Sequence, residues 1–462
     1  MLLKNKIKDL KTIIKSNNIL TSEEECYCYA TDATNLIKSS ESPDVVVFVE
    51  SIEDVQKVLK FAYKNEIPVV SRGAGTNMVG ACTTNKGGIV LNFSKMNKIL
   101  EINPSNMTAR VQPGVILGDL KTAVEGLGLF FPPDPSNYKV STVGGAIAQS
   151  SGGAMTFKYG TTKDYVLSLK VVTSDGKLMT LGANTIKDAV GYHLAQLMVG
   201  SEGTLAIIVE AELKLIPKPE TRRAVSAYFD SVEDAVKAVD NIIDLQIFPA
   251  AIDFMDKNAI KTVEEYSHCG LNLSKEGLLL IELDGYSANM DYLIQTTTQA
   301  LNDAGITEIR IASSEKESED IWQARRVSFA ATTRLAPDVV TDDIIVPRHN
   351  LGKIVRRCNE IADKYNLKLC MVGHIGDGNL HPQIALDLED ETELKTCMEA
   401  KSEMYNAAIE LGGTISAEHG VGIEKIPYLR SVVDSNAIEY MKMIKRMFDP
   451  KNILNPGKIF EL

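Results

Sequence analysis

The sequence predicts an α+β protein, and three observations support this. A glycine-rich loop, SRGAGTNMVG at 71–80, joins one apolar strand to a second, GGIVLNF at 87–93, and no helix follows it directly. The segment YVLSLKVVTSDGKLMTL at 165–181 has the pattern of a β-hairpin with its turn at Asp175–Gly176. After residue 222, strands alternate with amphipathic helices and glycine loops become rare. That rhythm is typical of helices packed on one face of an antiparallel sheet.

The loop at 71–80 excludes a Rossmann unit. That unit requires a strand, a GxGxxG turn and then a helix whose N-terminus faces a diphosphate. Successive backbone N–H groups of a glycine-rich loop can still form an anion-binding nest without such a helix. We therefore expect this loop to bind phosphate without a Rossmann fold.

Two further glycine-rich segments occur in the first half of the chain. STVGGAIAQSSGGAMTFKYG at 141–160 contains five glycines and five Ser or Thr residues, a composition also found in flexible linkers. Ordered segments flank it on both sides, so we do not interpret it as a linker. VGSEGTLAIIVEAELKLIPKP at 199–219 predicts a turn at 200–203 followed by a long strand. Three such loops attached to strands favour one extended ligand lying over the backbone.

The remaining elements follow from the period of the apolar residues. In chain order we expect a strand at 44–51, a helix at 53–66, a strand at 109–115, a helix from 117 to Gly126 or Gly128, a strand and helix at 222–244, a strand at 277–285, a helix at 293–305, strands at 306–314 and 367–374, and helices at 392–413 and 435–448. The predicted domains are a polar helical segment at 1–40, which ends in the loop SSESPD, a first domain at 41–220, a second at 221–425, and a C-terminal helix and tail at 426–462 that return to the first domain.

Composition narrows the class of protein. The 462 residues carry a formal net charge of −12, which argues against a nucleic-acid binder because no basic surplus exists to neutralise phosphates. The seven cysteines form no CxxC pair, so an iron–sulfur cluster or a thiolate zinc site in this chain is not expected. The start of the chain has the pattern of an amphipathic helix, unlike a signal peptide, and no apolar run is long enough for a membrane span. We expect a cytoplasmic protein.

Three of the six histidines fall in two short motifs, GHIGDGNLH at 373–381 and AEHGVG at 417–422. A lone histidine is more often a satisfied core residue, but three beside a carboxylate and among glycines favour a functional site. His374, His381 and Glu418 can hold one divalent cation with coordination positions left open, and zinc, ferrous iron and manganese all suit these ligands. His419 is then able to move a proton.

Taken together, these motifs resemble the FAD-linked oxidase family, typified by the glycolate oxidase D-subunit and the flavin-dependent D-lactate and D-2-hydroxyglutarate dehydrogenases. The matching stretches occur in family order over roughly residues 40 to 460. They are SRGAGTN, PPDPSN, STVGGAIAQSSGG, KYG, VGSEGTL, IWQARR, GHIGDGNLHP, AEHGVG and FDPKNILNPGK. The resemblance implies a vanillyl-alcohol-oxidase (PCMH) type of FAD domain at 41–220, built from two α+β lobes, and an α+β cap domain with an antiparallel sheet.

The resemblance also assigns residues to the cofactor. The diphosphate would be held by Arg72, Gly73, Ala74, Gly75, Thr76, Asn77 and Gly80. The flavin and its linker would be lined by Pro133, Asp134, Ser136, Thr142, Gly144, Gly145, Gly152 and Gly153, and the adenine side closed by Glu202, Gly203 and Thr204, with Asn455 as a further contact. The sequence departs from the family pattern at Ala146, Ser150 and Ala206, and at His193, which is not counted as catalytic. Since neither early glycine loop contains histidine, we expect FAD to be bound non-covalently.

The activity that the resemblance implies is oxidation of a small D-2-hydroxy acid, foremost D-lactate, to the 2-oxo acid. Arg325 would bind the substrate carboxylate, the metal would acidify the hydroxyl, and His419 would accept its proton. We expect Arg326 to be a solvated neighbour, Trp322 a core residue and Asn379 a turn residue. Electrons would pass to an external acceptor, such as an electron-transferring flavoprotein, an iron–sulfur subunit or a quinone. The alternatives are a glycolate or 2-hydroxy-acid oxidase subunit using oxygen or a quinone, and a non-catalytic FAD-binding subunit.

Overall fold

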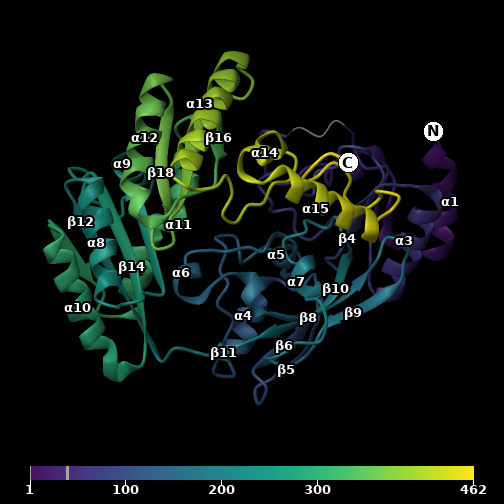
Figure 1. Cartoon of the computed structure of the whole chain (residues 1–462), viewed down its shortest axis with the longest axis horizontal. Helices are drawn as coiled ribbons and strands as arrows, with labels where there is room; N and C mark the ends of the chain where they lie inside the picture. Colours follow the sequence, from purple (N-terminus) through teal and green to yellow (C-terminus); the bar gives the residue numbers. More distant parts are fainter. Residues whose placement is uncertain (1, 38–40) are drawn as a thin grey trace. The chain divides into compact units, whose positions relative to one another are not determined.

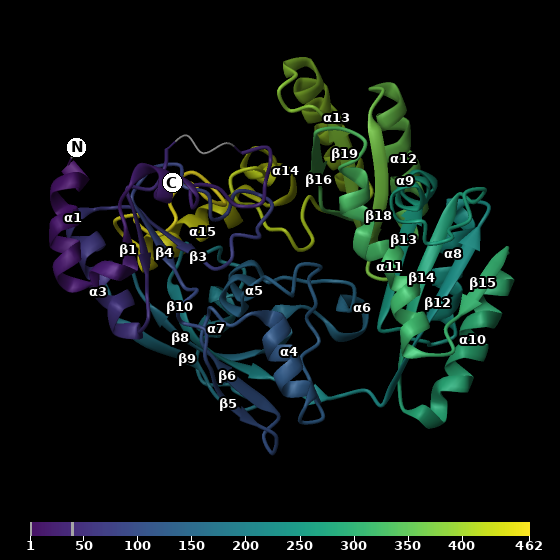
Figure 2. The same cartoon turned by 180° about the vertical axis from the view of Figure 1, so that it is seen from behind.

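The computed structural model describes residues 2–37 and 41–462 and divides into two compact units (Figures 1 and 2). The first unit comprises Met1–Ser151, Thr161–Lys218 and Glu418–Leu462, and the second comprises Gly152–Gly160 and Pro219–Ala417. The predicted domain boundaries at 40, 220 and 425 stay predictions, and the part of the predicted SSESPD loop at 39–40 lies outside the described residues. No helix within the described ranges is both long enough and apolar enough to cross a lipid bilayer.

The first unit contains a four-stranded sheet in the order β1-β2-β4-β3. Its strands are β1 (Ile19–Leu20), β2 (Val45–Phe48), β3 (Val69–Arg72) and β4 (Ile89–Asn92). Strands β2 and β3 both run parallel to β4, and the nearly continuous apolar residues of β2 (VVVF) and β4 (IVLN) suit a sheet covered on both faces. The helices α1 (Leu2–Ile13) and α3 (Ile52–Asn65) contribute apolar side chains to the core around this sheet. The glycine-rich loop therefore begins at the end of a parallel strand, and another strand follows it, as predicted.

A second sheet of the first unit is antiparallel, in the order β5-β6-β10-β8-β9. Its strands are β5 (Ile99–Asn103), β6 (Thr108–Val111), β8 (Val166–Val172), β9 (Leu178–Gly182) and β10 (Ile207–Lys214). The predicted hairpin is confirmed, since β8 pairs with β9 and the Gly176 N–H donates to the Thr173 carbonyl across the turn. Helix α4 (Leu117–Glu125) ends at Gly126, one of the two predicted positions. The C-terminal helix α15 (Ser435–Phe448) packs Ile444 and Phe448 against the hydrophobic core that this sheet helps to form.

The segment STVGGAIAQS, which we interpreted as a glycine loop, instead contains a helix, α5 (Val143–Gln149). Thr142 caps it by accepting a hydrogen bond from the Gly145 N–H, and its apolar residues Val143, Ala146 and Ile147 are buried at helical spacing. A Cβ at Gly144 would lie 2.5 Å from the Pro113 Cβ, so the glycine permits close packing of this helix. The glycine pair hid the helical pattern in the sequence because glycine is a poor helix former.

The second unit is built on an eight-stranded sheet in the order β15-β12-β14-β13-β18-β19-β16, with β17 paired to β19. Its strands are β12 (Thr221–Phe229), β13 (Ala251–Asp256), β14 (Gly277–Gly285), β15 (Glu308–Ile311), β16 (Asp338–Thr341), β17 (Ile344–Ile345), β18 (Lys368–His374) and β19 (Asn379–Leu386). Its longer helices are α8 (Val232–Asp244), α9 (Lys257–Ser267), α10 (Met290–Asp303), α11 (Glu315–Thr332), α12 (Leu351–Lys364) and α13 (Glu391–Glu410). All the strand pairs are antiparallel, as predicted.

Helices cover both faces of this sheet, so the expectation of a single covered face was wrong. Helices α9 and α11 share a core with Leu278 and Leu280 of β14. Helix α8 lies on the other face, since a Cβ at Gly277 would come within 3.6 Å of the Ala235 side chain. Alternate residues of a strand point to opposite faces, so β14 is buried by helices on both sides.

Candidate functional site

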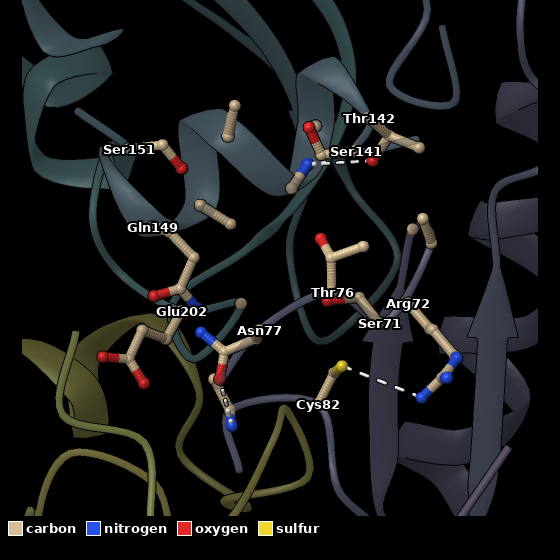
Figure 3. A pocket seen from close by; sticks show the side chains of 18 of the residues that line it. Ser71, Arg72, Thr76, Asn77, Cys82, Ser141, Thr142, Gln149, Ser151 and Glu202 are labelled. Carbon is tan, nitrogen blue, oxygen red and sulfur yellow. Dashed lines mark hydrogen bonds between the residues drawn. The ribbon is translucent and has the colours of Figure 1, made fainter. Parts of the chain in front are cut away.

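The first unit contains a pocket lined by the predicted glycine loops, shown in Figure 3. It encloses about 1220 Å³ of empty space, part of it open to solvent. The predicted cofactor residues on its lining are Arg72, Gly73, Ala74, Gly75, Thr76, Asn77, Ser136, Thr142, Gly144, Gly145, Glu202 and Gly203. Glu418 and His419, which follow much later in the chain, also line it. The structure thus brings together the three segments in which the sequence predicted glycine loops.

The loop after β3 lines the pocket and carries backbone N–H groups that are available to a ligand. Those of residues 73–77 have no hydrogen-bond partner within the described parts of the chain. Gly75 has a φ of +74°, which residues with a Cβ rarely adopt, and a Cβ there would also displace the Arg72 guanidinium, whose Nη2 would lie 2.1 Å away. Clustered amides of this kind form an anion nest, which suits the diphosphate of a dinucleotide. The residues present therefore fit FAD at this loop.

Seven predicted cofactor residues do not line this pocket: Gly80, Pro133, Asp134, Gly152, Gly153, Thr204 and Asn455. The segment that holds Gly152 and Gly153 belongs to the second unit, where Tyr159 Oη donates to Asp284 at 2.7 Å and Lys158 Nζ donates to the Asp284 carbonyl at 3.2 Å. Asn455 instead braces the pocket wall, because its Nδ2 donates to the carbonyl oxygens of Ala81 and Glu202. The roles of these residues toward the cofactor stay predictions.

The pocket also contains residues that the sequence analysis missed, above all Gln149 and Cys82 (Figure 3). The buried Oε1 of Gln149 has no hydrogen-bond partner among the described residues, so it is an acceptor available to a ligand. Cys82 lies 3.8 Å from Nη1 of Arg72, and burial raises the pKa of its thiol to about 12. Cys82 follows the motif SRGAGTNMVG, and Gln149 lies within STVGGAIAQSSGG. Their positions next to or inside recognised motifs could therefore have indicated that they line the pocket. Ala146 and Ala206, two of the departures from the family pattern, also line the pocket.

Glu202 and Asn77 hold the loop that carries Glu418 and His419. The carboxylate of Glu202, which is only 5% exposed, accepts hydrogen bonds from the N–H groups of Val421 at 2.7 Å and Gly422 at 2.9 Å. Asn77 Nδ2 donates to the His419 carbonyl at 3.1 Å. Burial raises the pKa of the Glu202 carboxyl to about 7, although the two N–H groups act in the opposite direction. The sequence predicts that Glu202 closes over the adenine of FAD, and that role stays a prediction. In the structure the Glu202 carboxylate accepts hydrogen bonds from the loop that carries Glu418 and His419.

The second unit holds the two histidines of the GHIGDGNLH motif on adjacent strands, at the end of β18 and in β19. The register pairs His374 with Asn379 and His381 with Val372, and the two rings are 5.2 Å apart. Both are buried, at 7% and 5% exposure. The glycine turn of the motif is therefore a hairpin turn that brings residues seven apart in sequence onto one site.

Each histidine ring is oriented by a partner that the sequence analysis did not identify. Nδ1 of His374 lies 2.8 Å from Oδ1 of Asp253, and Nδ1 of His381 lies 3.2 Å from the carbonyl of Asp342. Such contacts fix the tautomer and direction of metal-binding imidazoles. A usable signal was present, because Asp253 is one of two carboxylates in the otherwise apolar segment AAIDFMD, and a buried carboxylate needs partners.

Arg325, the predicted carboxylate-binding residue, lies on α11, where its Nε donates to Oδ2 of Asp253 at 2.7 Å. Arg326 is exposed, as predicted, and its Nη2 donates to the carbonyl of Glu319. Trp322 packs against the core of the second unit, as predicted.

Asn379 and Asp343 brace the chain just before Glu418. Asn379 Nδ2 donates to Oδ1 of Asp343 at 2.8 Å. The other carboxylate oxygen of Asp343 accepts from Ser416 Oγ and from the Ala417 N–H, both at 2.8 Å. Two buried carboxylates thus hold the chain on either side of Glu418 and His419: Asp343 in the second unit and Glu202 in the first.

Comparisons with known proteins agree with this arrangement. The family described as FAD linked oxidases, C-terminal domain, matches residues 218–459, and the FAD binding domain family matches residues 43–182. The glycolate oxidase subunit GlcD of Bacillus subtilis is 42% identical over 94% of this chain and 92% of its own length. A D-lactate dehydrogenase of Anaerostipes hadrus is 34% identical over 90% of this chain and 89% of its own length.

Among solved structures, p-cresol methylhydroxylase with substrate bound aligns with a TM-score of 0.83 at 16% sequence identity, over 99% of this chain and 96% of its own. That likeness confirms the predicted PCMH-type fold. The match to the C-terminal family covers more than half of the chain, and the curated relatives extend it to nearly the whole length. The chain therefore belongs to the family of FAD-linked oxidases.

Proposed function

We propose that this protein is an FAD-dependent dehydrogenase that oxidises a small D-2-hydroxy acid, foremost D-lactate, to the 2-oxo acid. The observation that carries the proposal is the pair of histidines His374 and His381, buried on one hairpin, with His374 joined through Asp253 to Arg325. An imidazole pair suits a divalent cation, and a guanidinium suits a carboxylate. A 2-hydroxy acid offers both a hydroxyl and a carboxylate.

In this proposal the amides of residues 73–77 hold the diphosphate of FAD, which when bound accepts a hydride from the α-carbon of the substrate. FAD is bound non-covalently. Two side chains that line the pocket, Cys82 and His419, could form a covalent link to the flavin. The raised pKa of Cys82 keeps its thiol protonated and therefore unreactive, and His419 is assigned to proton transfer. The yellow colour should accordingly leave the protein with acid precipitation, and colour that stays with the pellet would contradict this assignment.

His374, His381 and Glu418 are the proposed ligands of a divalent zinc, iron or manganese ion, whose chemistry when bound is to lower the pKa of the substrate hydroxyl. The donor set of two imidazoles and one carboxylate fits these three ions. Arg325 binds the substrate carboxylate and orients the α-carbon. His419, held through its carbonyl by Asn77, accepts the hydroxyl proton.

The second candidate substrate is glycolate, favoured by the 42% identity to a protein named glycolate oxidase subunit. That name also favours a partner protein as the electron acceptor, and we propose an electron-transferring flavoprotein or an iron–sulfur subunit, with a quinone or oxygen as the alternative. A non-catalytic FAD-binding subunit is disfavoured because Arg325, His374, His381, Glu418 and His419 are all present.

A panel of hydroxy acids mixed anaerobically with the purified, metal-loaded protein tests the proposal. We expect D-lactate to bleach the flavin absorbance faster than glycolate or D-2-hydroxyglutarate, and L-lactate, which differs only in configuration, to be slow. Faster bleaching by glycolate would select the second candidate. If no hydroxy acid bleaches a flavin that dithionite reduces readily, the proposed activity is wrong. Admitting air then separates a dehydrogenase, which reoxidises slowly, from an oxidase.

A further inference from the structure

One carboxylate in the second unit joins two side chains with different proposed tasks. Asp253 lies on β13 and is 1% exposed. Its Oδ1 is 2.8 Å from Nδ1 of His374, and its Oδ2 is 2.7 Å from Nε of Arg325. The strand register explains the first contact, since Phe254 pairs with Gly373 and the antiparallel partner of residue 253 is therefore residue 374. Helix α11 supplies the second contact from its Arg325 position.

The contact with His374 decides which ring nitrogen can take a ligand. An ionised carboxylate only accepts hydrogen bonds, so Nδ1 of His374 must carry the proton when the ring is neutral. The ligating atom is then Nε2. The guanidinium of Arg325, which is always protonated, donates to the other oxygen of Asp253, so both carboxylate oxygens act as acceptors.

The contact with Arg325 decides which edge of the guanidinium meets the substrate. Asp253 uses the Nε–H, and Ser328 Oγ accepts a weaker hydrogen bond from Nη1 at 3.3 Å. Nη1 carries two hydrogens, so the terminal edge formed by Nη1 and Nη2 still offers two parallel N–H groups. That edge can bind a carboxylate in the bidentate geometry.

We infer that Asp253 is a positioning residue that sets two directions at once: it assigns Nε2 of His374 to the metal and the terminal edge of Arg325 to the substrate carboxylate. The inference rests on the proposed function, because it takes His374 as a metal ligand and Arg325 as the carboxylate-binding residue. Since one rigid strand carries the shared carboxylate, the separation between the two recognition points is set by β13.

Replacing Asp253 with Asn tests this, because the amide keeps the shape but offers one acceptor and one donor group. If the amide oxygen faces His374, the NH₂ meets the Nε–H of Arg325, donor against donor. If the oxygen faces Arg325, the NH₂ donates to Nδ1 of His374 and drives the ring proton onto Nε2, where it blocks the ligand. Neither orientation satisfies both contacts.

The measurement is Mn²⁺ binding to the metal-free, FAD-containing protein by isothermal titration calorimetry. Losing such an outer contact typically weakens metal binding by about 10- to 100-fold, and we expect that loss in Asp253→Asn. The KM for D-lactate should rise in the same variant. Asp256→Asn is the matched control: it lies on the same strand, and a single carboxylate oxygen accepts from the N–H groups of Ala259 and Met371, which an amide oxygen can also do. It should change neither quantity.

Equal Mn²⁺ affinity in the parent and in Asp253→Asn would overturn the inference while leaving the metal site standing. If the parent itself binds no Mn²⁺, the proposed metal site is wrong and the inference falls with it. Should Asp253→Asn fail to fold, the ¹⁵N spectrum of the metal-free parent decides, with the His374 signals assigned by their loss in His374→Gln. We expect the Nδ1–H tautomer, and the Nε2–H tautomer would refute the inference.

Discussion

Replacing Glu202 with Gln should remove a pH dependence from the stability of the flavin-free protein. Glu202 is buried in the first unit, where its carboxylate accepts hydrogen bonds from the Val421 and Gly422 N–H groups. Burial raises its pKa from an ordinary 4.5 to about 7. Between these two values the unfolded chain releases a proton that the folded chain retains. The parent protein should therefore lose stability as pH rises from about 4.5 to 7, with the loss complete above pH 7.

The size of this effect follows from the gap between the two pKa values. One unit of pKa corresponds to about 1.4 kcal/mol, so the whole gap of Glu202 corresponds to about 3 kcal/mol. The interval from pH 5 to pH 8 covers about 2–3 kcal/mol of it, because titration of the unfolded chain has already begun at pH 5. Gln does not titrate, so the variant should be less stable than the parent at pH 5, and this difference should shrink by about 2–3 kcal/mol at pH 8.

Urea unfolding at several pH values between 5 and 8, followed by circular dichroism, measures this difference. Asp256, whose pKa burial also raises to about 7, titrates in both proteins and cancels in the comparison. Glu210→Gln is the control, since that carboxylate lies on the second sheet of the first unit and pairs with Lys170 at 2.8 Å. Any change that Glu210→Gln shows across the pH range measures the effect of removing a carboxylate other than Glu202. A difference between parent and Glu202→Gln that does not change with pH would refute the reasoning.

Three further predictions concern the proposed activity. Gly75→Ala should weaken FAD binding to the apoprotein by about tenfold, because an alanine in the left-handed conformation costs roughly 1–2 kcal/mol even before its clash with Arg72. Fluorescence quenching of FAD measures this affinity. Gly191→Ala is the control, because Gly191 has a similar φ of +75° with open space around it, and this variant should bind FAD normally. Arg325→Lys should raise the substrate KM strongly, because an ammonium cannot reproduce a bidentate guanidinium contact, while Arg326→Lys should be nearly silent in steady-state kinetics. Equal effects would mean that the wrong arginine was chosen. His419→Asn should slow flavin reduction in stopped-flow by about 10²–10⁴-fold with the metal retained, and loss of the metal would make His419 a ligand instead.

The sequence by itself determined the features that depend on short-range pattern. The period of apolar residues located α4, the hairpin of β8 and β9, and the strands β12, β14, β15 and β18 of the second unit, but it did not locate β13, β16, β17 or β19. The strand–loop–strand order at 71–80 excluded a Rossmann unit and predicted an anion-binding loop, and the pocket is lined by that loop. The GHIGDGNLH spacing predicted paired histidines, and the rings lie 5.2 Å apart. In each case the residues that decide the outcome are close neighbours in the chain.

Only the tertiary structure decided which distant residues meet. Asp253 precedes His374 by 121 positions, and Glu202 precedes Gly422 by 220, so no local pattern links either pair. The segment 152–160 groups with the second unit, where Asp284 accepts hydrogen bonds from Lys158 and Tyr159. Helix α5 formed at STVGGAIAQ against its glycine content because Val143, Ala146 and Ile147 are buried in the core. Burial and partner choice are properties of the folded chain, and a buried carboxylate is recognised only when the groups that satisfy it are known.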